Sequence, residues 1–338
     1  MDPLIDIPAK FCLGVAATTY ILSLLTGNVS HIDRLWTVLP TIYTAYFALV
    51  PLWPPAATGY VEFEIIQQST ASFSSRALLM LALVFTWMVR LTYNTWRRGL
   101  YNLNDEDYRW AIVRRNIPPW LFQVLNLTFI AIAQNILLLL LAIPVKMAVT
   151  QPHTTLSTSD YILGALGFLT ILLEFIADNQ QYSYQTFKRS GQLNRNEWFG
   201  ARIPWTKRDA ERGFVTRGLW AWSRHPNCLC EQAFWIIINA FPLLSPDAPK
   251  LFASGVTITS LASLAPCLLL CLLFFSSTRL TESISLSKYP VAYAAYQRRV
   301  GMFVPFFTPV WGVLLKLQGK KAEVDELVYG QGRAKKTE

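Results

Sequence analysis

Gly213–Glu231 reads GFVTRGLWAWSRHPNCLCE and leads directly into an apolar segment. The stretch puts Arg224, His225, Asn227 and Glu231 at the mouth of a predicted membrane helix. An unpaired charge close to hydrocarbon costs several kcal/mol, so polar groups at such a place are usually functional or tightly partnered. We therefore expect the functional site to be organised around this junction.

The composition predicts a membrane protein, because 53% of the residues are hydrophobic, 15% are charged, and the apolar residues come in long blocks. A helix needs about 20 apolar residues to cross a bilayer. We expect an all-α, polytopic transmembrane helical bundle with about seven spans. The candidate spans are Phe11–Thr26, Trp36–Trp53, Ala77–Tyr93, Trp120–Val145, Tyr161–Ala177, Gln232–Leu244 and Leu251–Ser276.

Lysine and arginine predict the orientation of the helices. Of the 30 basic residues, five lie in Arg97–Arg115, nine in Lys188–Arg224 and ten from Arg279 to the end. Basic loops face the cytosol, which puts these regions on that side and gives a lumenal N-terminus and a cytosolic C-terminus. The expected lumenal loops carry at most one basic residue each and are Pro54–Ser74, Pro144–Asp160 and Ser245–Lys250, with Arg76 just beyond the first.

One transmembrane domain is expected over residues 1–310, with a cofactor-binding half at about 160–310 and a basic cytosolic tail at 311–338. Met1–Lys10 has two aspartates and no basic n-region, so we expect no cleavable signal peptide. Lys335–Glu338 reads KKTE, which resembles the dilysine signal for the endoplasmic reticulum; a solvated basic tail is the alternative. The sequon at Asn28 falls on the cytosolic side and is expected to stay unglycosylated.

The net charge of +9 does not indicate nucleic-acid binding, because the basic residues lie in loops between apolar spans and no nucleic-acid-binding motif is present. Membrane topology accounts for the charge. The basic loops would contact either an anionic cofactor or only anionic lipid headgroups, and the sequence does not distinguish between the two. The five cysteines, of which three lie in or beside apolar segments, indicate no disulfide framework.

Polar residues end the third predicted span. Arg90, Asn94 and Arg97 are spaced by four and three, so they share one helical face. Arg97 has a simpler interpretation as a helix end that extends to the headgroups. Arg90 lies inside the apolar block, and we expect a buried partner for it.

The fifth predicted span ends in a polar stripe formed by Glu174, Asp178, Gln181, Gln185 and Lys188. An ordinary solvated exit face explains Gln185 and Lys188. Glu174 lies among apolar residues, and we expect it to be paired or hydrogen-bonded inside the bundle.

The last predicted span is followed by Glu282, Tyr289, Tyr293, Tyr296 and Arg299. A tyrosine stripe at a membrane surface is also typical of an interfacial belt. All four polar groups lie on the predicted cytosolic side, which favours one site there. Arginine, histidine and tyrosine side chains would hold the phosphates and ribose of a soluble cofactor, and the bundle would hold a lipidic substrate.

Other chemistries fit the sequence less well. There is no G-x-G-x-x-G and no P-loop, which excludes a soluble nucleotide-binding domain. His225, Cys228 and Cys230 form an H-x-x-C-x-C pattern, but zinc sites need four ligands and the chain has three histidines, so we expect no metal. A Cys228 nucleophile lacks an evident base.

The motifs that suggest a family run in order from residue 33 to 305. They are Asp33-Arg34-Leu35-Trp36 with Pro40, Arg90-Leu91 with Asn94, Arg97-Arg98-Gly99, Glu106–Trp110, Glu174, Ala177-Asp178, Gln181, Gly218-Leu219-Trp220, Ser223–Asn227, Glu231, Glu282, Tyr293, Tyr296 and Pro305. With these motifs the chain resembles the steroid 5α-reductase-like membrane proteins, most closely their poorly characterised branch of unknown function.

The resemblance implies a seven-helix bundle in the endoplasmic reticulum membrane that binds NADPH from the cytosolic side. It also implies reduction of a carbon–carbon double bond conjugated to a carbonyl in a lipid or steroid-like substrate, with a hydrogen-bond donor polarising the carbonyl. No residue is assigned as that donor. The implied cofactor residues are Asn94, Arg97, Glu174, Asp178, Gln181, Arg224, His225, Asn227, Glu231, Tyr293, Tyr296 and Arg299.

Two features depart from the family pattern. Relatives usually read R-H-P-N-Y-x-G-E, whereas Cys228 and Cys230 stand here in place of the tyrosine and the glycine. Arg195–Arg208 looks like an additional segment, a surface loop over the site. These changes suit a different substrate, or a fold that is kept while activity is lost.

Two alternatives remain. Isoprenylcysteine carboxyl methyltransferases and phospholipid methyltransferases share the R-H-P motif and use S-adenosylmethionine, but they resemble this chain only near the C-terminus. A transporter or a non-catalytic lipid-binding membrane protein is the other alternative, although no internal repeat typical of transporters is present. An apolar bundle accepts sterols, fatty-acyl chains and polyprenols alike, so the substrate stays open, as does the oligomeric state.

Overall fold

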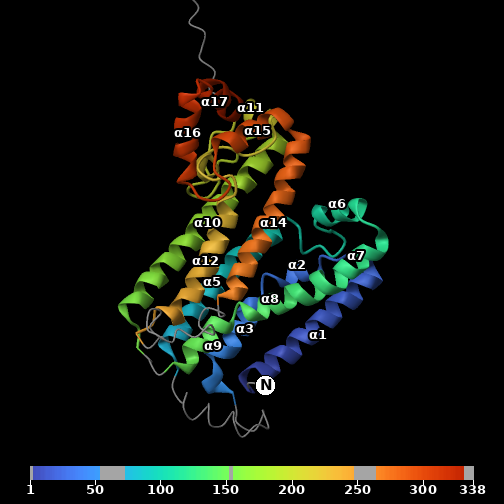
Figure 1. The fold of residues 1–338 in the computed structure, drawn as a ribbon, viewed down its shortest axis with the longest axis vertical. Helices are drawn as coiled ribbons and strands as arrows, with labels where there is room; N and C mark the ends of the chain where they lie inside the picture. Colours follow the sequence, from blue (N-terminus) through green and yellow to red (C-terminus); the bar gives the residue numbers. More distant parts are fainter. Residues whose placement is uncertain (1–2, 54–72, 152–154, 247–263, 331–338) are drawn as a thin grey trace, which may run out of the picture. The chain divides into compact units, whose positions relative to one another are not determined.

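The computed structural model describes residues 3–53, 73–151, 155–246 and 264–330. Within these ranges the regular elements are helices, and the one strand-like contact is a parallel bridge between Ser223 and Gly301. The chain forms two compact units. Unit 1 contains Met1–Phe168 and Phe234–Leu270, and unit 2 contains Leu169–Ala233 and Cys271–Glu338. The boundaries fall inside α10 (Thr158–Ser190), α12 (Pro226–Leu243) and α14 (Ala265–Lys288) (Figure 1).

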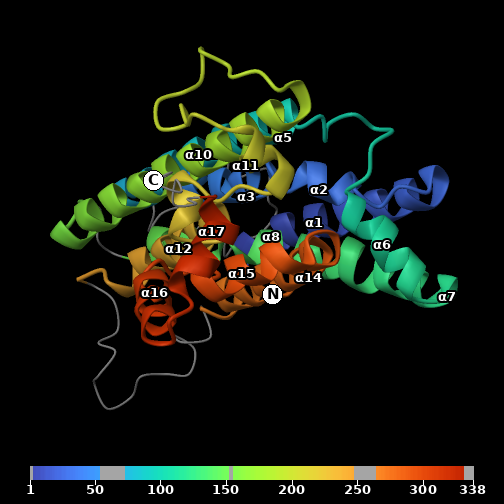
Figure 2. The same cartoon turned by 90° about the horizontal axis from the view of Figure 1, so that it is seen from above.

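The other helices each belong to one unit. Unit 1 holds α1 (Pro3–Thr26), α2 (His31–Leu35), α3 (Leu39–Ala48), the short helix η1 (Val50–Leu52), α5 (Ser75–Arg97), α6 (Tyr108–Asn116), α7 (Pro119–Leu125), the π-helix η3 (Asn126–Ala133), α8 (Gln134–Leu140) and α9 (Ile143–Thr150). Unit 2 holds α11 (Lys207–Arg212), the short helix η4 (Gly218–Ala221), α15 (Pro290–Arg299), α16 (Phe307–Leu317) and α17 (Lys321–Tyr329). In unit 1, α6 and α7 lie side by side (Figure 2).

Side chains in the sequence explain where several helices begin. Ser74 caps α5, because its hydroxyl accepts from the Ala77 amide at 3.3 Å. Thr206 and Asp209 form a reciprocal capping box at the start of α11. These caps satisfy amide groups that have no partner inside the helix.

Five helical stretches in the described ranges are long and apolar enough to cross a membrane. They have 23 to 33 residues and are Leu4–Thr26, Ser75–Arg97, Pro119–Thr150, Thr158–Ser190 and Ala265–Lys288. This is the helical content of a multi-pass membrane protein. The five stretches coincide with five of the seven predicted spans.

The other two predicted spans lie in shorter helices. Trp36–Trp53 covers the 10-residue α3 and η1, and Gln232–Leu244 lies in the 18-residue α12. The start of the last predicted span, most of the loop Pro54–Ser74 and the dilysine segment Lys335–Glu338 lie outside the described residues. The number of spans and the side on which each terminus lies stay predictions.

A buried ion pair in unit 1 joins the starts of α5 and α10. Arg76 donates from Nε and Nη2 to Asp160 at 2.7 and 3.1 Å, and both side chains are 0% exposed. Gln151 accepts from Arg76 Nη1 at 2.9 Å, and the Ser157 amide and hydroxyl each donate to Asp160 at 2.8 Å. The two charges are tolerated because they pair with each other and bond in addition to Gln151 and Ser157.

Two motif runs of the sequence meet in unit 1. Trp110 donates from its ring nitrogen to Asp33 at 3.1 Å. Arg34 donates to the carbonyl oxygens of Leu100, Asn102 and Asp105 at 2.9, 2.9 and 2.5 Å. The side-chain nitrogen of Asn28, in the predicted sequon, donates to the Leu103 and Asp105 carbonyls at 3.1 and 2.9 Å. These motifs therefore tie α2 to the loop that follows α5.

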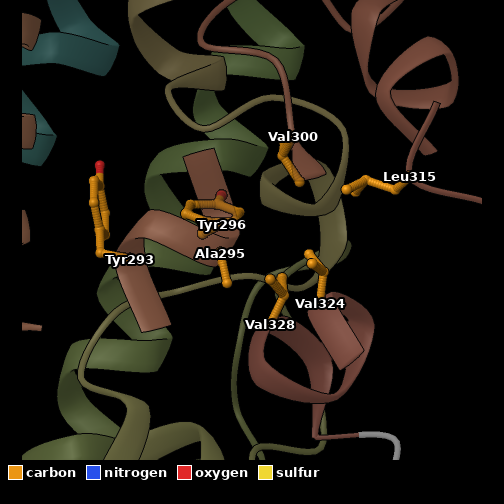
Figure 3. Close-up of a cluster of buried hydrophobic side chains, with 7 residues drawn as sticks. All are labelled: Tyr293, Ala295, Tyr296, Val300, Leu315, Val324 and Val328. Carbon is orange, nitrogen blue, oxygen red and sulfur yellow. The ribbon is translucent and has the colours of Figure 1, made fainter. Parts of the chain in front are cut away.

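The C-terminal helices of unit 2 form a small core of their own. Tyr296 and Val300 pack with Leu315 of α16 and with Val324 and Val328 of α17 (Figure 3). The sequence predicts a basic tail over residues 311–338, but its described part folds into helices. The reason is that apolar residues four positions apart on α17 are buried beneath the charged ones.

Candidate functional site

The turn Arg224-His225-Pro226-Asn227 connects η4 to α12 in unit 2. The amides of Arg224 and His225 donate to the carbonyls of Gly301 and Met302 at 2.9 and 3.1 Å. Pro226 begins α12, where the missing N–H of proline is harmless because it would have no helical partner. The turn is therefore held in place by the segment that follows α15.

Glu282 of α14 binds the side chains of both Arg224 and His225. Arg224 donates from Nε and Nη2 to its carboxylate at 2.6 and 3.1 Å, and His225 donates from Nε2 at 3.0 Å. Gln297 donates to the same carboxylate at 3.0 Å, and Arg224 Nη1 donates to the carbonyls of Gln297 and Val300. We call Arg224, His225, Glu282 and Gln297 the Glu282 lock.

The Glu282 lock engages Arg224 and His225, two of the predicted cofactor residues. All three guanidinium nitrogens of Arg224, and Nε2 of His225, donate to groups of the protein. The Arg224, His225 and Glu282 side chains are only 8%, 11% and 4% exposed. A phosphate that took over these bonds would have to displace a carboxylate or carbonyl, at the cost of a buried ion pair. The structure thus gives Arg224 a positioning role, since it holds the turn on which Asn227 lies.

Asn227 bonds to Asp178, and Gln181 follows Asp178 by three residues on α10; we call these three residues the acceptor cluster. Asp178 and Gln181 lie three residues apart on one face of α10, and Asn227 Nδ2 faces Asp178 Oδ1 at 3.4 Å. The amide oxygens of Gln181 and Asn227 are buried and accept no hydrogen bond from the described residues. An unsatisfied buried acceptor costs about 1–3 kcal/mol, so a ligand with donors gains free energy here.

Two further carboxylates lie in this part of unit 2. Glu174, one turn before Asp178, and Glu231 on α12 are 3% and 4% exposed. With Asp178 they interact electrostatically with the thiol of Cys228. The region is therefore rich in acceptors and negative charge. The part of the chain that the structure describes contains no group of three histidine, cysteine or acidic side chains arranged for a metal.

Gln180 positions the chain beside this site, although it falls outside the spacing pattern of the polar stripe. Its Nε2 donates to the Gly200 carbonyl at 2.7 Å, and its Oε1 accepts from the Leu219 amide at 2.9 Å. Gly218 has φ +67°, and a Cβ there would lie 2.5 Å from Gln180 Oε1. Both the left-handed backbone and the close approach therefore require glycine at this position.

The segment Arg195–Arg208 is only partly the surface loop that the sequence predicts. Phe199 is 91% exposed, but Trp205 is 4% exposed and packs on Tyr184 of α10. Its ring nitrogen donates to Ser183 at 2.9 Å. The end of the segment therefore belongs to the core of unit 2.

The predicted tyrosine stripe is buried on α15. Tyr293 and Tyr296 are 4% and 2% exposed, and burial raises the pKa of both phenols. The Tyr296 hydroxyl donates to the Trp220 carbonyl at 2.5 Å, which ties α15 to η4. Both tyrosines belong to the buried cluster drawn in Figure 3, and their ring centroids lie 5.9 Å apart.

Arg299 ends α15 beside a cavity of about 590 Å³. It donates from Nε to Asp325 at 2.7 Å and from Nη1 to the Thr308 carbonyl at 3.0 Å. Arg217 and Lys321 also line this cavity. It is therefore a place in unit 2 where basic side chains adjoin a hollow large enough for a ligand.

The remaining predicted cofactor residues, Asn94 and Arg97, belong to unit 1. Arg97 donates from Nε and Nη2 to Asn94 Oδ1 at 3.0 and 2.9 Å. Its guanidinium also lies 5.0 Å from the centre of the Tyr93 ring. The structure thus brings Asn94 and Arg97 together on α5, and the other predicted residues all lie in unit 2.

Residues 19–300 match a family described as "Protein of unknown function (DUF1295)". The chain belongs to the DUF1295 family. It is 35% identical over 285 residues to an uncharacterised protein of the fission yeast Schizosaccharomyces pombe, with 84% of this chain and 74% of the relative covered. No solved structure matches the chain.

The Glu282 lock and the acceptor cluster both lie inside the part of this DUF1295 protein that matches the family. In the lock each guanidinium nitrogen of Arg224 donates to the protein, while the cluster contains two buried amide oxygens that accept no hydrogen bond from the described residues. Chemically, the arrangement offers a rigid turn and a set of hydrogen-bond acceptors.

Proposed function

We propose that this DUF1295 protein is a membrane-embedded reductase that uses NADPH to reduce a carbon–carbon double bond conjugated to a carbonyl group in a lipid or steroid-like substrate. The observation that carries the proposal is the acceptor cluster, in which the buried oxygens of Gln181 and Asn227 accept no hydrogen bond among the described residues. Its Asn227 belongs to the R-H-P-N turn, the motif through which the chain resembles the NADPH-dependent steroid reductases.

A nicotinamide nucleotide has the hydrogen-bond donors that the acceptors of this cluster need. Its ribose hydroxyls and carboxamide NH₂ are donors, and Asp178, Gln181 and Asn227 would accept from them. Its phosphates need cations, and Arg299 with Arg217 and Lys321 would supply these in the same unit. When bound, NADPH supplies the hydride, and the protein binds, orients and excludes water.

The Glu282 lock supports this binding indirectly. Arg224 and His225 precede Asn227 by three and two residues, and both are fixed by the Glu282 carboxylate. Asn227 is therefore presented from a turn whose conformation is set before any ligand arrives. Such preorganisation lowers the free-energy cost of binding.

S-adenosylmethionine is a second candidate cofactor, because one observation favours it. The carboxyl groups of Glu174, Asp178 and Glu231 act electrostatically on Cys228, and an acidic environment suits a cationic sulfonium better than it suits phosphates. Methyl transfer to a lipid is the corresponding activity.

The test is a calorimetric titration of the detergent-purified protein with NADPH, NADH and S-adenosylmethionine. We expect NADPH to bind and Gln181→Ala to weaken that binding about tenfold. Gln185→Ala is the matched control, since it changes the same residue type one turn further along α10 and leaves the acceptor cluster intact. Preferential binding of S-adenosylmethionine would contradict the reductase proposal and favour a methyltransferase. No binding of any of the three compounds would indicate a non-catalytic lipid-binding protein.

We also propose that the protein resides in the endoplasmic reticulum membrane, with a lumenal N-terminus and a cytosolic C-terminus. The distribution of basic residues and the dilysine-like Lys335–Glu338 support this location. Removal of Lys335–Glu338 should release the protein to later compartments of the secretory pathway, as seen by fluorescence microscopy. Unchanged localisation of the truncated protein would contradict the role of the tail.

A further inference from the structure

Unit 1 contains a second cavity, of about 470 Å³, that the proposed function does not use. One wall is the face of α1 from Phe11 to Leu22, and the polar end is formed by His31 and Arg34 of α2. The volume is in the range of small-molecule sites.

The α1 wall presents hydrocarbon. Phe11 and Leu22 are 44% and 38% exposed, and a Cβ on Gly14 would meet nothing within 4 Å, so the cavity is open at that residue. The hydroxyls of Thr18 and Thr19 donate to the carbonyls of Gly14 and Val15 at 2.8 and 2.9 Å. Since these donors are used inside the helix, the wall suits an apolar chain.

The polar end contains a buried guanidinium with one hydrogen to spare. Arg34 is 8% exposed and has five N–H hydrogens. Three go to the backbone carbonyls that follow α5, and one Nη1 hydrogen goes to His31 Nδ1 at 3.3 Å. The second Nη1 hydrogen has no acceptor among the residues that the structure describes.

His31 adds no charge to this end. A guanidinium can only donate, so Nδ1 of His31 accepts and the ring hydrogen lies on Nε2. Nε2 then donates to the Thr26 hydroxyl at 2.9 Å, which in turn donates to the Leu22 carbonyl at 2.7 Å. Burial and the charge of Arg34 lower the pKa of His31, which favours this neutral form.

Arg34 also has no carboxylate as a hydrogen-bond partner in the described ranges. Asp33, Asp105 and Glu106 act on it through space. Each of them is already bonded elsewhere, to Trp110, Asn102 and Arg114 respectively. A buried cation that is held only by neutral groups gains most from a hydrogen-bonded anion.

We propose that this cavity binds a long-chain carboxylate, with the carboxylate on Arg34 Nη1 and the hydrocarbon chain along α1. A single free hydrogen suits a carboxylate, whereas a phosphate head would need more donors than this end offers. The site lies within unit 1 and does not depend on the cofactor chemistry proposed for unit 2.

The test measures binding of radiolabelled oleate and of methyl oleate to the full-length protein in detergent. Gly14→Leu fills the cavity with a residue that also favours a helix more than glycine does, and we expect it to weaken oleate binding about tenfold. Ala17→Leu is the matched control, because Ala17 is exposed on the same helix and lies outside the cavity lining. Equal oleate binding by Gly14→Leu and the unchanged protein would overturn the proposal.

The carboxylate preference is tested separately. The unchanged protein should bind oleate about tenfold more tightly than methyl oleate, and Arg34→Gln should remove this preference. Equal affinity of the unchanged protein for the acid and its ester would overturn the assignment of Arg34 even if Arg34→Gln fails to fold. Titration of the same samples with NADPH separates the two proposals, since each ligand is expected to bind whether or not the other does.

Discussion

Each unit contains a buried arginine–carboxylate pair, and the two pairs have different surroundings. In unit 1 the Arg76–Asp160 pair is 0% exposed, and no polar atom of its hydrogen-bonded neighbours lacks a partner. In unit 2 the Arg224–Glu282 pair lies beside Asn227, whose buried oxygen accepts nothing from the described residues. The same kind of ion pair therefore has fully bonded neighbours in unit 1, whereas in unit 2 it lies next to an acceptor without a hydrogen bond. Burial of a charge therefore does not by itself mark a functional residue, and it is the unused oxygen of Asn227 that makes the region in unit 2 the candidate site.

The largest expected effect on stability comes from breaking the Arg76–Asp160 pair of unit 1. Asp160→Asn leaves the Arg76 charge buried without a counterion, which should lower the free energy of unfolding by about 3–5 kcal/mol. The readout is thermal unfolding followed by tryptophan fluorescence in detergent. Lys10→Ala is the control, because it removes one partner of the exposed pair Lys10–Asp6 and should cost less than about 1 kcal/mol. Equal losses for the two variants would mean that the buried pair adds nothing.

Glu282→Gln tests the corresponding Arg224–Glu282 pair of unit 2. The amide cannot neutralise Arg224, and we expect a loss of about 3 kcal/mol in the free energy of unfolding together with weaker NADPH binding. Asp178→Asn should weaken NADPH binding without that loss of stability. If Glu282→Gln instead kept full stability and lost only cofactor affinity, Glu282 would belong to the binding site and not to its support.

Gly218→Ala tests the turn that packs on Gln180. The left-handed backbone costs an alanine about 1 kcal/mol, and the contact with Gln180 Oε1 adds to that cost. Gly191→Ala is the control, since Gly191 has φ +70° and a Cβ there would meet nothing within 4 Å. The difference between their unfolding temperatures isolates the contact, and no difference would show that Gln180 moves freely.

The smallest expected effect concerns the pH response of unit 1. The pKa of His31 lies below its ordinary value of 6.5, because of burial and then the charge of Arg34. The neutral ring therefore stabilises the fold fully above pH 6.5, and this contribution falls as the pH drops from 6.5 through the lower folded-state pKa. Unfolding temperatures measured across this range should decline less in His31→Gln. Parallel curves for the two proteins would exclude His31 as the cause.

Local sequence patterns predicted the parts of the fold that depend on local chemistry. Long apolar blocks predicted the five membrane-length helices, because hydrophobicity over about 20 residues decides that element. The spacing of Asp178 and Gln181 predicted their shared face on α10. The turn at Arg224–Asn227 stood out because polar groups next to an apolar segment are costly.

Contacts between distant residues were beyond those patterns. Arg76 and Asp160 are 84 residues apart, and neither belongs to a periodic pattern. Gln180 points to a different side of α10 from the polar stripe, so its bonds to Gly200 and Leu219 depend on where the loop and η4 pack. The bonds of Arg224 to Glu282 and to backbone carbonyls became visible only in three dimensions.

The Glu282 lock changes how an R-H-P-N sequence should be interpreted. In this chain its arginine and histidine fix the shape of a backbone turn. Two of the four residues of the motif are therefore explained by architecture alone, so the presence of the motif in a sequence is not by itself evidence for a particular cofactor or reaction.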